Sequence, residues 1–238
     1  MASLLFYRGL QVITPTPTGA GGLALENDLK YLRDGWFPLT EDTHWADQAA
    51  STSTITMNAD LTTVIPVGTP VKFKLSGSYY YAIVTALAAG LLTLAGAPLT
   101  TGDGDLEELW IGDPGKVHHI HLHVAGAYAD AANTTLLLTD AKNPHEWNGP
   151  AAALVQFRAY TNVETNNPKI NVSVAGSAVG TANTNTGLNM AAAQTWYSTV
   201  VDLNTTNYTI ARDEAFEVTT TEAADAADLT VELVIVEV

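Results

Sequence analysis

Four histidines crowd into one six-residue segment, His118-His-Ile-His-Leu-His123, and they are the residues best suited to metal chemistry. Side chains alternate between the two faces of a β-strand, so His119, His121 and His123 would share one face. Imidazoles two residues apart on a strand suit zinc and similar metals. The nearby His145-Glu146 pair is the only candidate for a further ligand, and its spacing fixes no metal geometry. We name the three histidines as candidate ligands and predict no bound metal.

The same histidine stripe has two other interpretations. It could form a polar, solvent-facing row on an outer strand, or it could lie at a contact between subunits. In a homotrimer, three symmetry-related imidazoles can meet on the axis. Protonation of the histidines at acidic pH would then loosen the assembly.

Motifs for catalysis are absent from the sequence. It contains no Gly-x-Ser-x-Gly, phosphate loop, Gly-x-Gly-x-x-Gly or His-Glu-x-x-His motif. The lack of cysteine excludes thiol nucleophiles and disulfides. With 25 acidic residues, some pair of carboxylates is always available, so such a pair carries no information. We predict that the chain is not an enzyme and uses no cofactor, with a metal- or carboxylate-dependent enzyme as the least favoured alternative.

Charge and hydropathy exclude two classes of partner. The 238 residues include 10 Lys and Arg against 25 Asp and Glu, a net charge of −15, which would repel nucleic acid. Residues 82–99 carry no charge and are long enough to span a membrane. Gly90, Gly96 and Pro98 interrupt this stretch, and Val84, Thr85 and Leu91-Leu-Thr93 suit strands on either side of a turn. The stretch therefore predicts a β-hairpin, and we expect neither nucleic acid nor membrane as a partner.

Residues 1–50 are predicted to form an N-terminal extended arm followed by a short helix. Pro15 and Pro17 alternate with threonines, including Thr14, and this pattern cannot continue a helix. Residues 27–35 carry a capping residue, a partial apolar face and a closing glycine, which predict a helix of about two turns. We expect the arm and the aromatic residues after the helix to bind a partner; the residues are Thr14, Pro15, Pro17, Trp36, Phe37 and Trp45.

Residues 51–115 are predicted to form a small β-barrel. Residues 53–57, 70–75, 79–84 and 91–94 have strand patterns, and so short a sheet protects its edges best by closing. Residues 101–115 are predicted to be an acidic, turn-rich linker around Leu109-Trp-Ile111. Its cluster of four carboxylates lacks the spacing of an EF-hand loop, which favours a solvated turn.

Residues 116–238 repeat short strand patterns separated by turn residues. Seven candidate strands, at 117–125, 134–138, 153–160, 169–175, 195–202, 215–221 and 229–236, predict an antiparallel, jelly-roll-like β-sandwich. The last strand runs continuously apolar toward its end and should be central in its sheet. The fold class is therefore all-β. Among the tryptophans, Trp147 lies in a turn-rich segment and is the best candidate for an exposed sugar-stacking ring.

Two parts of the sequence resemble virion proteins of tailed bacteriophages. Residues 27–36 and 60–85, which include Val67-Gly-Thr-Pro-Val-Lys-Phe73 and Tyr79-Tyr-Tyr81, resemble a module in which a short helix precedes a small barrel. Residues 227–236 resemble the last strand of jelly-roll domains in head-decoration and fibre proteins. The resemblance implies a structural protein, often trimeric, with no catalytic residues.

The resulting functional expectation is a capsid decoration, or cement, protein located in the virion and assembled in the bacterial host cytoplasm. Its partners would be the major capsid protein or other virion proteins and further copies of itself, as a homotrimer. It would stabilise the head by burying surface on the capsid lattice, without chemistry. The alternative is a tail-fibre or receptor-binding module that recognises host surface glycans.

Overall fold

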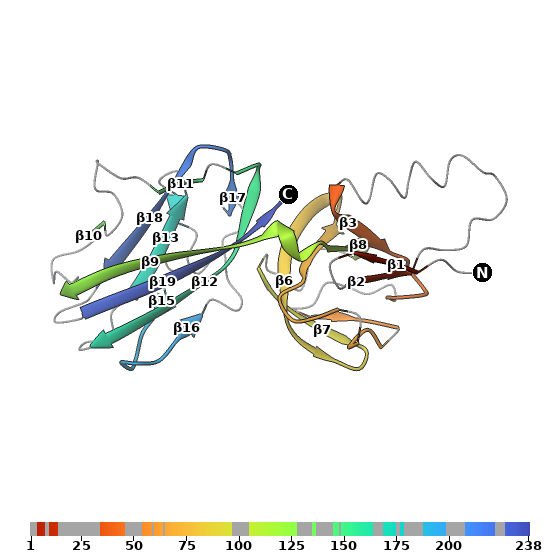
Figure 1. Cartoon of the computed structure of the whole chain (residues 1–238), viewed down its shortest axis with the longest axis horizontal. Helices are drawn as coiled ribbons and strands as arrows, with labels where there is room; N and C mark the ends of the chain where they lie inside the picture. Colours follow the sequence, from red (N-terminus) through yellow and green to blue (C-terminus); the bar gives the residue numbers. More distant parts are fainter. Residues whose placement is uncertain are drawn as a thin grey trace. The chain divides into compact units, whose positions relative to one another are not determined.

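A computed structural model describes residues 4–7, 10–13, 34–45, 54–58, 60–63, 65–96, 105–127, 135–136, 145–147, 149–163, 169–174, 177–178, 188–198, 208–221 and 227–238. The chain divides into two compact units. Unit 1 comprises residues 1–94 and 100–116, and unit 2 comprises residues 95–99 and 117–238. Both units consist of antiparallel β-sheets, so the predicted all-β class is confirmed (Figure 1).

Unit 1 contains a six-stranded antiparallel sheet with the strand order β3-β8-β5-β6-β7-β4. Its strands are β3 (Trp36–Leu39), β4 (Thr54–Thr56), β5 (Pro70–Leu75), β6 (Ser78–Ala88), β7 (Leu91–Gly96) and β8 (Leu106–Gly112). A separate two-stranded sheet pairs β1 (Leu4–Tyr7) with β2 (Leu10–Ile13). Since β3 belongs to the six-stranded sheet, that sheet begins before residue 51, where the sequence analysis placed the start of the barrel.

The six-stranded sheet curls until its two edges meet. Trp45, just after edge strand β3, forms an antiparallel bridge with Met57, just after edge strand β4. The backbone N–H of Asn58 donates to the carbonyl of His44 at 2.8 Å beside this bridge. The small barrel that the sequence predicts is therefore a curled sheet joined at one point. Its buried side chains include Ile55, Val71, Phe73, Leu75, Leu92, Leu109 and Ile111.

The prediction that residues 101–115 form a linker is wrong for their second half. Strand β8 lies inside the sheet, between β3 and β5. The register of β8 against β5 shifts between Lys74 and Leu75. This irregularity buries both Leu106 and Leu109, which are three residues apart, and so breaks the alternation by which a strand is recognised.

Within residues 82–96, the structure shows the predicted β-hairpin. Strand β6 ends at Ala88, a turn at Ala89-Gly90 follows, and β7 begins at Leu91. Gly90 adopts a φ of 74°, a conformation that glycine accepts without strain. Among the described residues, no helix is long and apolar enough to cross a membrane.

Gly112 allows the Trp36 ring to pack across β8. A Cβ at Gly112 would lie 2.8 Å from Pro70 Cγ and 2.9 Å from Trp36 Cζ3, both parts of rigid rings. We expect Gly112→Ala to lower the free energy of unfolding of unit 1 by about 1–3 kcal/mol, because neither ring can yield easily. Thermal denaturation of the full chain would measure this. Ser78→Ala, at an exposed position of the same sheet, should change stability by less than about 0.5 kcal/mol, and equal effects would contradict the overpacking argument.

Unit 2 is built from two sheets. One has the order β16-β12-β19-β9, with β17 also paired to β12, and the other has the order β10-β18-β13-β14, with β11 on β18 and β15 on β13. The strands are β9 (Val117–Ala127), β10 (Thr135–Leu136), β11 (His145–Trp147), β12 (Ala152–Val163), β13 (Lys169–Val174), β14 (Ser177–Ala178), β15 (Leu188–Asn189), β16 (Tyr197–Ser198), β17 (Thr209–Ile210), β18 (Glu214–Thr221) and β19 (Ala227–Glu237).

The strand order of unit 2 is that of a jelly roll. Successive groups of one to three strands along the chain alternate between the two sheets, and the last strand, β19, pairs with the first, β9. Figure 1 shows β9, β19 and β12 side by side, with β18 and β13 in the second layer. The predicted jelly-roll-like sandwich and the central position of the last strand are both confirmed.

The core of unit 2 lies between the sheets. From the first sheet, Leu122 of β9, Leu233 of β19 and Phe157 of β12 are buried, and Phe157 lies directly opposite Leu233. Ile170, Val172 and Val174 of β13 are buried on the second sheet. Because side chains alternate along each strand, the neighbouring residues of β9, β19 and β12 point to the other face of their sheet.

Candidate functional site

The outer face of the first sheet of unit 2 carries the histidine stripe. His119, His121 and His123 are exposed and share this face, as alternation predicts, while Leu122 between them is buried. The nearby His145 belongs to β11, in the other sheet of the unit. Within the described part of the chain, no three His, Asp or Glu side chains are placed to hold a metal ion. The stripe instead takes part in contacts across the sheet.

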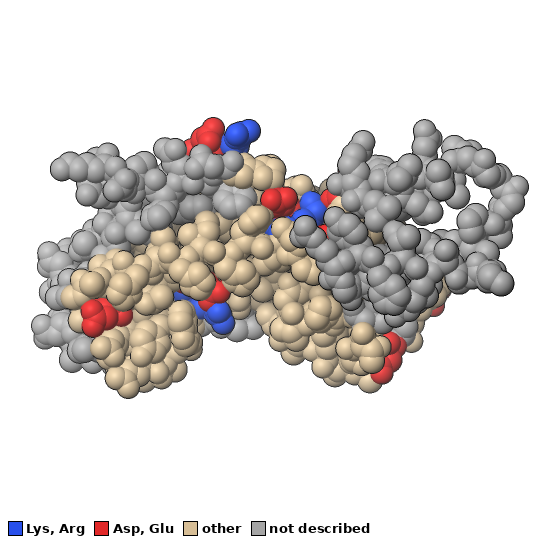
Figure 2. Space-filling model, in the orientation of Figure 1, with Lys and Arg blue, Asp and Glu red and all other residues tan. Residues whose placement is uncertain are grey.

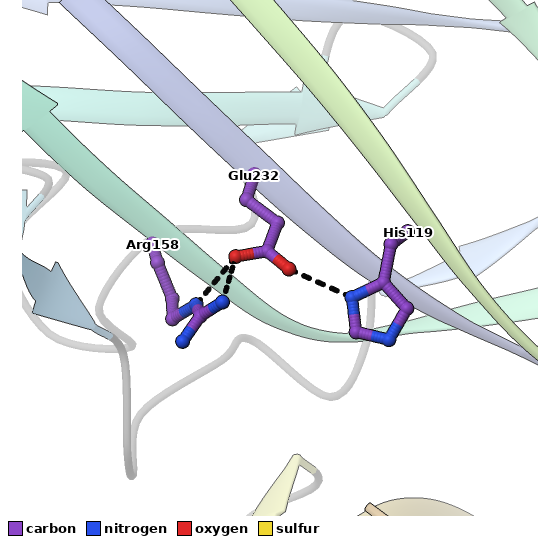
Figure 3. A network of polar contacts seen from close by, with 3 residues as sticks. All are labelled: His119, Arg158 and Glu232. Atoms are coloured by element: carbon purple, nitrogen blue, oxygen red, sulfur yellow. Dashed lines mark hydrogen bonds and ion pairs between the residues drawn. The ribbon is translucent and has the colours of Figure 1, made fainter.

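Glu232 is the centre of these contacts (Figure 3). It lies on central strand β19, opposite His121 of β9 and Arg158 of β12, and is only 3% exposed. His119 Nδ1 lies 2.7 Å from one carboxylate oxygen. Arg158 donates from Nε at 2.6 Å, and also from Nη2, to the other oxygen. The carboxylate is therefore held from both sides by neighbouring strands.

Two opposing effects act on the pKa of Glu232. Burial raises the pKa, since a buried carboxylate loses its hydration. The hydrogen bonds and charges of His119 and Arg158 lower the pKa by more, and the net result is a pKa below the usual glutamate range. Glu232 is therefore ionised at neutral pH and keeps the Arg158 side chain fixed in place.

An exposed aromatic side chain lies beside this network. The Trp196 ring is 5.5 Å from the Tyr160 ring between centroids, and the Arg158 guanidinium lies 5.4 Å from the centre of the Trp196 ring. Trp196 nevertheless remains 48% exposed. The backbone N–H of Gln194 donates to the carbonyl of Thr161 at 2.8 Å, which ties the segment before Trp196 to β12.

Sequence analysis missed Trp196, Arg158, Tyr160 and Glu232 as members of a site. One signal was available: Glu232 is the single charged residue within the apolar run 229–236, and a charge in a buried strand needs a partner. Trp147, the sequence-based candidate for an exposed ring, lies in β11 on the other sheet, and its side chain is outside the described residues.

Unit 1 presents a second group of aromatic and charged side chains, which we term the lysine–aromatic face (Lys72, Lys74, Lys116, Trp36, Tyr79, Tyr81 and Trp110). Lys72 Nζ lies 4.6 Å from the centre of the Tyr79 ring and 5.0 Å from that of Trp110. Tyr79 and Trp110 are in ring contact at 5.7 Å, and Tyr79 is 45% exposed. Cation–π contacts of this kind hold both the lysine and the rings in place.

The lysine–aromatic face continues to the edge of the sheet. Trp36 contacts Tyr81 at 5.8 Å, and Lys116 Nζ lies 5.2 Å from the centre of the Trp36 ring. Burial raises the pKa of Tyr81 to about 12, so its phenol stays neutral. At the other end, Lys74 forms ion pairs with Glu107 at 2.8 Å and with Glu108, and these contacts raise the pKa of Lys74.

The acidic cluster 101–108 is thus partly accounted for, because Glu107 and Glu108 are on β8 and pair with Lys74. Elsewhere charge is sparse: on the face drawn in Figure 2, acidic and basic side chains form only scattered patches. This agrees with a sequence of which only 15% is charged.

The residues expected to bind a partner have different environments. Trp45 is 1% exposed, and its Nε1–H donates to the Leu39 carbonyl at 3.1 Å, so its ring belongs to the core of unit 1. Trp36 is also buried, and Phe37 is half-buried on β3. Thr14, Pro15 and Pro17 lie outside the described residues, as does most of the predicted helix at 27–35.

Comparison with protein-family models, with curated proteins and with solved structures gives no match to this chain.

Proposed function

We propose that this chain is a non-catalytic structural protein of a tailed-phage virion, a capsid decoration protein that attaches to the major capsid lattice through its lysine–aromatic face. It acts as an oligomer of identical chains, most simply a trimer. The resemblance of residues 27–36, 60–85 and 227–236 to virion modules supports the class of protein. The lysine–aromatic face is the observation that carries the mode of attachment.

The lysine–aromatic face has the chemistry of an attachment surface. Within the described part of unit 1, all three basic residues, Lys72, Lys74 and Lys116, contact aromatic rings of this face. Tyr and Trp side chains dominate the binding energy of protein interfaces. Glu107 and Glu108 offset the charge of Lys74, so Lys72 and Lys116 provide the positive charge that favours an acidic patch on the partner.

Attachment by such a surface stabilises a shell by mass action. Each bound copy favours the assembled state over the dissociated state by an amount set by its affinity and concentration. No bond needs to be made or broken, which agrees with the lack of catalytic motifs in the sequence. The jelly-roll unit is then available for contacts with other copies or for projection from the surface.

The experiment is co-sedimentation of the purified protein with phage heads that lack it. We expect the wild-type chain to bind at saturable, stoichiometric levels. The double variant Lys72→Gln/Tyr79→Ala should bind about tenfold more weakly or worse, because it loses both the charge and the most exposed ring of the face.

Trp196→Ala, which removes an exposed ring from unit 2, is the matched control and should bind the heads as the wild type does. Circular dichroism would verify that all variants are folded. Absence of wild-type binding would refute the attachment to heads. Equal binding of the double variant and the wild type would refute the role of the lysine–aromatic face.

A further inference from the structure

We infer that the outer face of the β12–β19–β9 sheet is a binding site for a carboxylated sugar, such as a uronic-acid unit of a polysaccharide. The Trp196 ring would support the sugar ring, and Arg158 would bind its carboxylate. This site goes beyond the proposed attachment to the capsid. It uses the other unit of the chain and does not depend on where the protein is located.

Trp196 has the properties of a sugar-stacking ring. Indole rings are large and rigid, and they present an apolar face with a polar edge, which suits the C–H face of a pyranose. Contacts with Tyr160 and Arg158 fix the position of the ring, yet 48% of Trp196 remains exposed. A ring that is already fixed loses little conformational entropy when a ligand binds.

The polar groups beside Trp196 favour an acidic ligand. Arg158 uses Nε and Nη2 to bind Glu232, and its Nη1 points away from that carboxylate (Figure 3). No described residue accepts a hydrogen bond from Nη1, and planar guanidinium donors are well matched to a carboxylate. His119 engages Glu232 through Nδ1, no described residue contacts its Nε2, and His121 is exposed two residues further along the same face.

Glu232 itself is a positioning residue in this site. Both of its oxygens are engaged, by His119 and by Arg158, and its side chain is almost fully buried. It therefore orients the Arg158 guanidinium, and because its negative charge offsets that of Arg158, the preference for a carboxylate depends on the directed Nη1 donors rather than on net charge. The nearest other described acid of β19, Asp228, is engaged at the strand's start by the backbone N–H of Gly126 at 2.8 Å.

The net charge of −15 does not prevent the binding of a short acidic sugar. Charges farther away than about 8 Å are largely screened at physiological salt. The charges on this face of the sheet therefore affect the binding of an acidic sugar more than the net charge of the whole chain does. A long polyanion would meet the rest of the acidic chain, which favours an oligosaccharide of a few units over a full-length polyanion.

The test is a titration followed by tryptophan fluorescence and isothermal calorimetry, with hexagalacturonate as the probe and cellohexaose as its neutral counterpart. We expect saturable binding of hexagalacturonate that weakens as salt rises, and much weaker binding of cellohexaose. Trp196→Ala should reduce the affinity for hexagalacturonate at least about fivefold.

Two variants serve as controls for this titration. Tyr79→Ala removes a comparably exposed ring from unit 1 and should leave the affinity unchanged. His121→Ala, at an exposed position on the same face but separated from Arg158 by strand β19, should weaken binding by a smaller factor than Trp196→Ala. The inference is overturned if hexagalacturonate does not bind saturably, if cellohexaose binds equally well, or if Trp196→Ala retains the wild-type affinity.

Discussion

Trp45→Ala is expected to open the curled sheet of unit 1 and to lower its free energy of unfolding by about 3–5 kcal/mol. The substitution removes a fully buried ring and leaves a cavity. It also removes the hydrogen bond from Nε1 to the Leu39 carbonyl and weakens the Trp45–Met57 bridge, where the two edges of the sheet meet. In the described part of unit 1, the remaining links between these two edges are the hydrogen bonds that Asn58 donates to the carbonyls of His44 and Asp42.

Hydrogen exchange followed by mass spectrometry would test this expectation, because it reports on each segment separately. In the Trp45→Ala variant, β3 and β4 should exchange much faster, while β12 and β19 of unit 2 should keep their protection. Trp45→Phe keeps an aromatic ring in the core, so it should lower the free energy of unfolding by less than Trp45→Ala does. If β4 stays fully protected from hydrogen exchange in the Trp45→Ala variant, the bridge does not hold the two edges of the sheet together.

Arg158→Ala is expected to destabilise unit 2 by about 2–4 kcal/mol. Among the described residues, the substitution leaves the buried Glu232 carboxylate with His119 as its remaining partner, and a buried charge deprived of a partner is costly. In contrast, the double variant Arg158→Met/Glu232→Leu should recover most of the stability, since it removes both charges and fills the space with apolar groups. Urea denaturation of the single and double variants measures both effects.

The same network predicts how stability changes with pH. The pKa of Glu232 is lowered in the folded chain, so ionised Glu232 adds to the free energy of unfolding at any pH above the ordinary glutamate pKa of about 4.3. This added stability is lost as the pH falls through the lowered pKa, because Glu232 then becomes protonated in the folded chain as well. The stability difference between the wild type and Glu232→Gln should therefore shrink between neutral pH and about pH 3. A difference that stays constant over this range would contradict the assignment.

The strands that follow simple alternation could be predicted from the sequence. Residues 70–75 alternate lysine with apolar residues, and β5 has the predicted bounds. The apolar run at 229–236 predicted a central strand, and β19 lies between β12 and β9. In each of these segments, local pattern and tertiary environment agree, because burial on one or both faces selects the residue types directly.

Features that depend on register could not be predicted in this way. Strand β8 was missed because a register shift breaks its alternation. The network around Glu232 depends on which residues of β9 and β12 lie opposite it, and these residues are separated from it by more than 70 positions. The sequence indicated that His119, His121 and His123 share a face, but it could not indicate their neighbours on the adjacent strands.

The pairing of β9 with β19 also bears on how the chain is made. Strand β9 begins at Val117, and the partner that completes its sheet lies at Ala227–Glu237. During synthesis, all the described strands of the six-stranded sheet of unit 1 exist once residue 112 has left the ribosome. The jelly roll has to wait for more than a hundred further residues before its central strand exists. A chain that stops before β19 would thus carry the complete six-stranded sheet of unit 1, while β9 and β12 of unit 2 would lack the strand that lies between them.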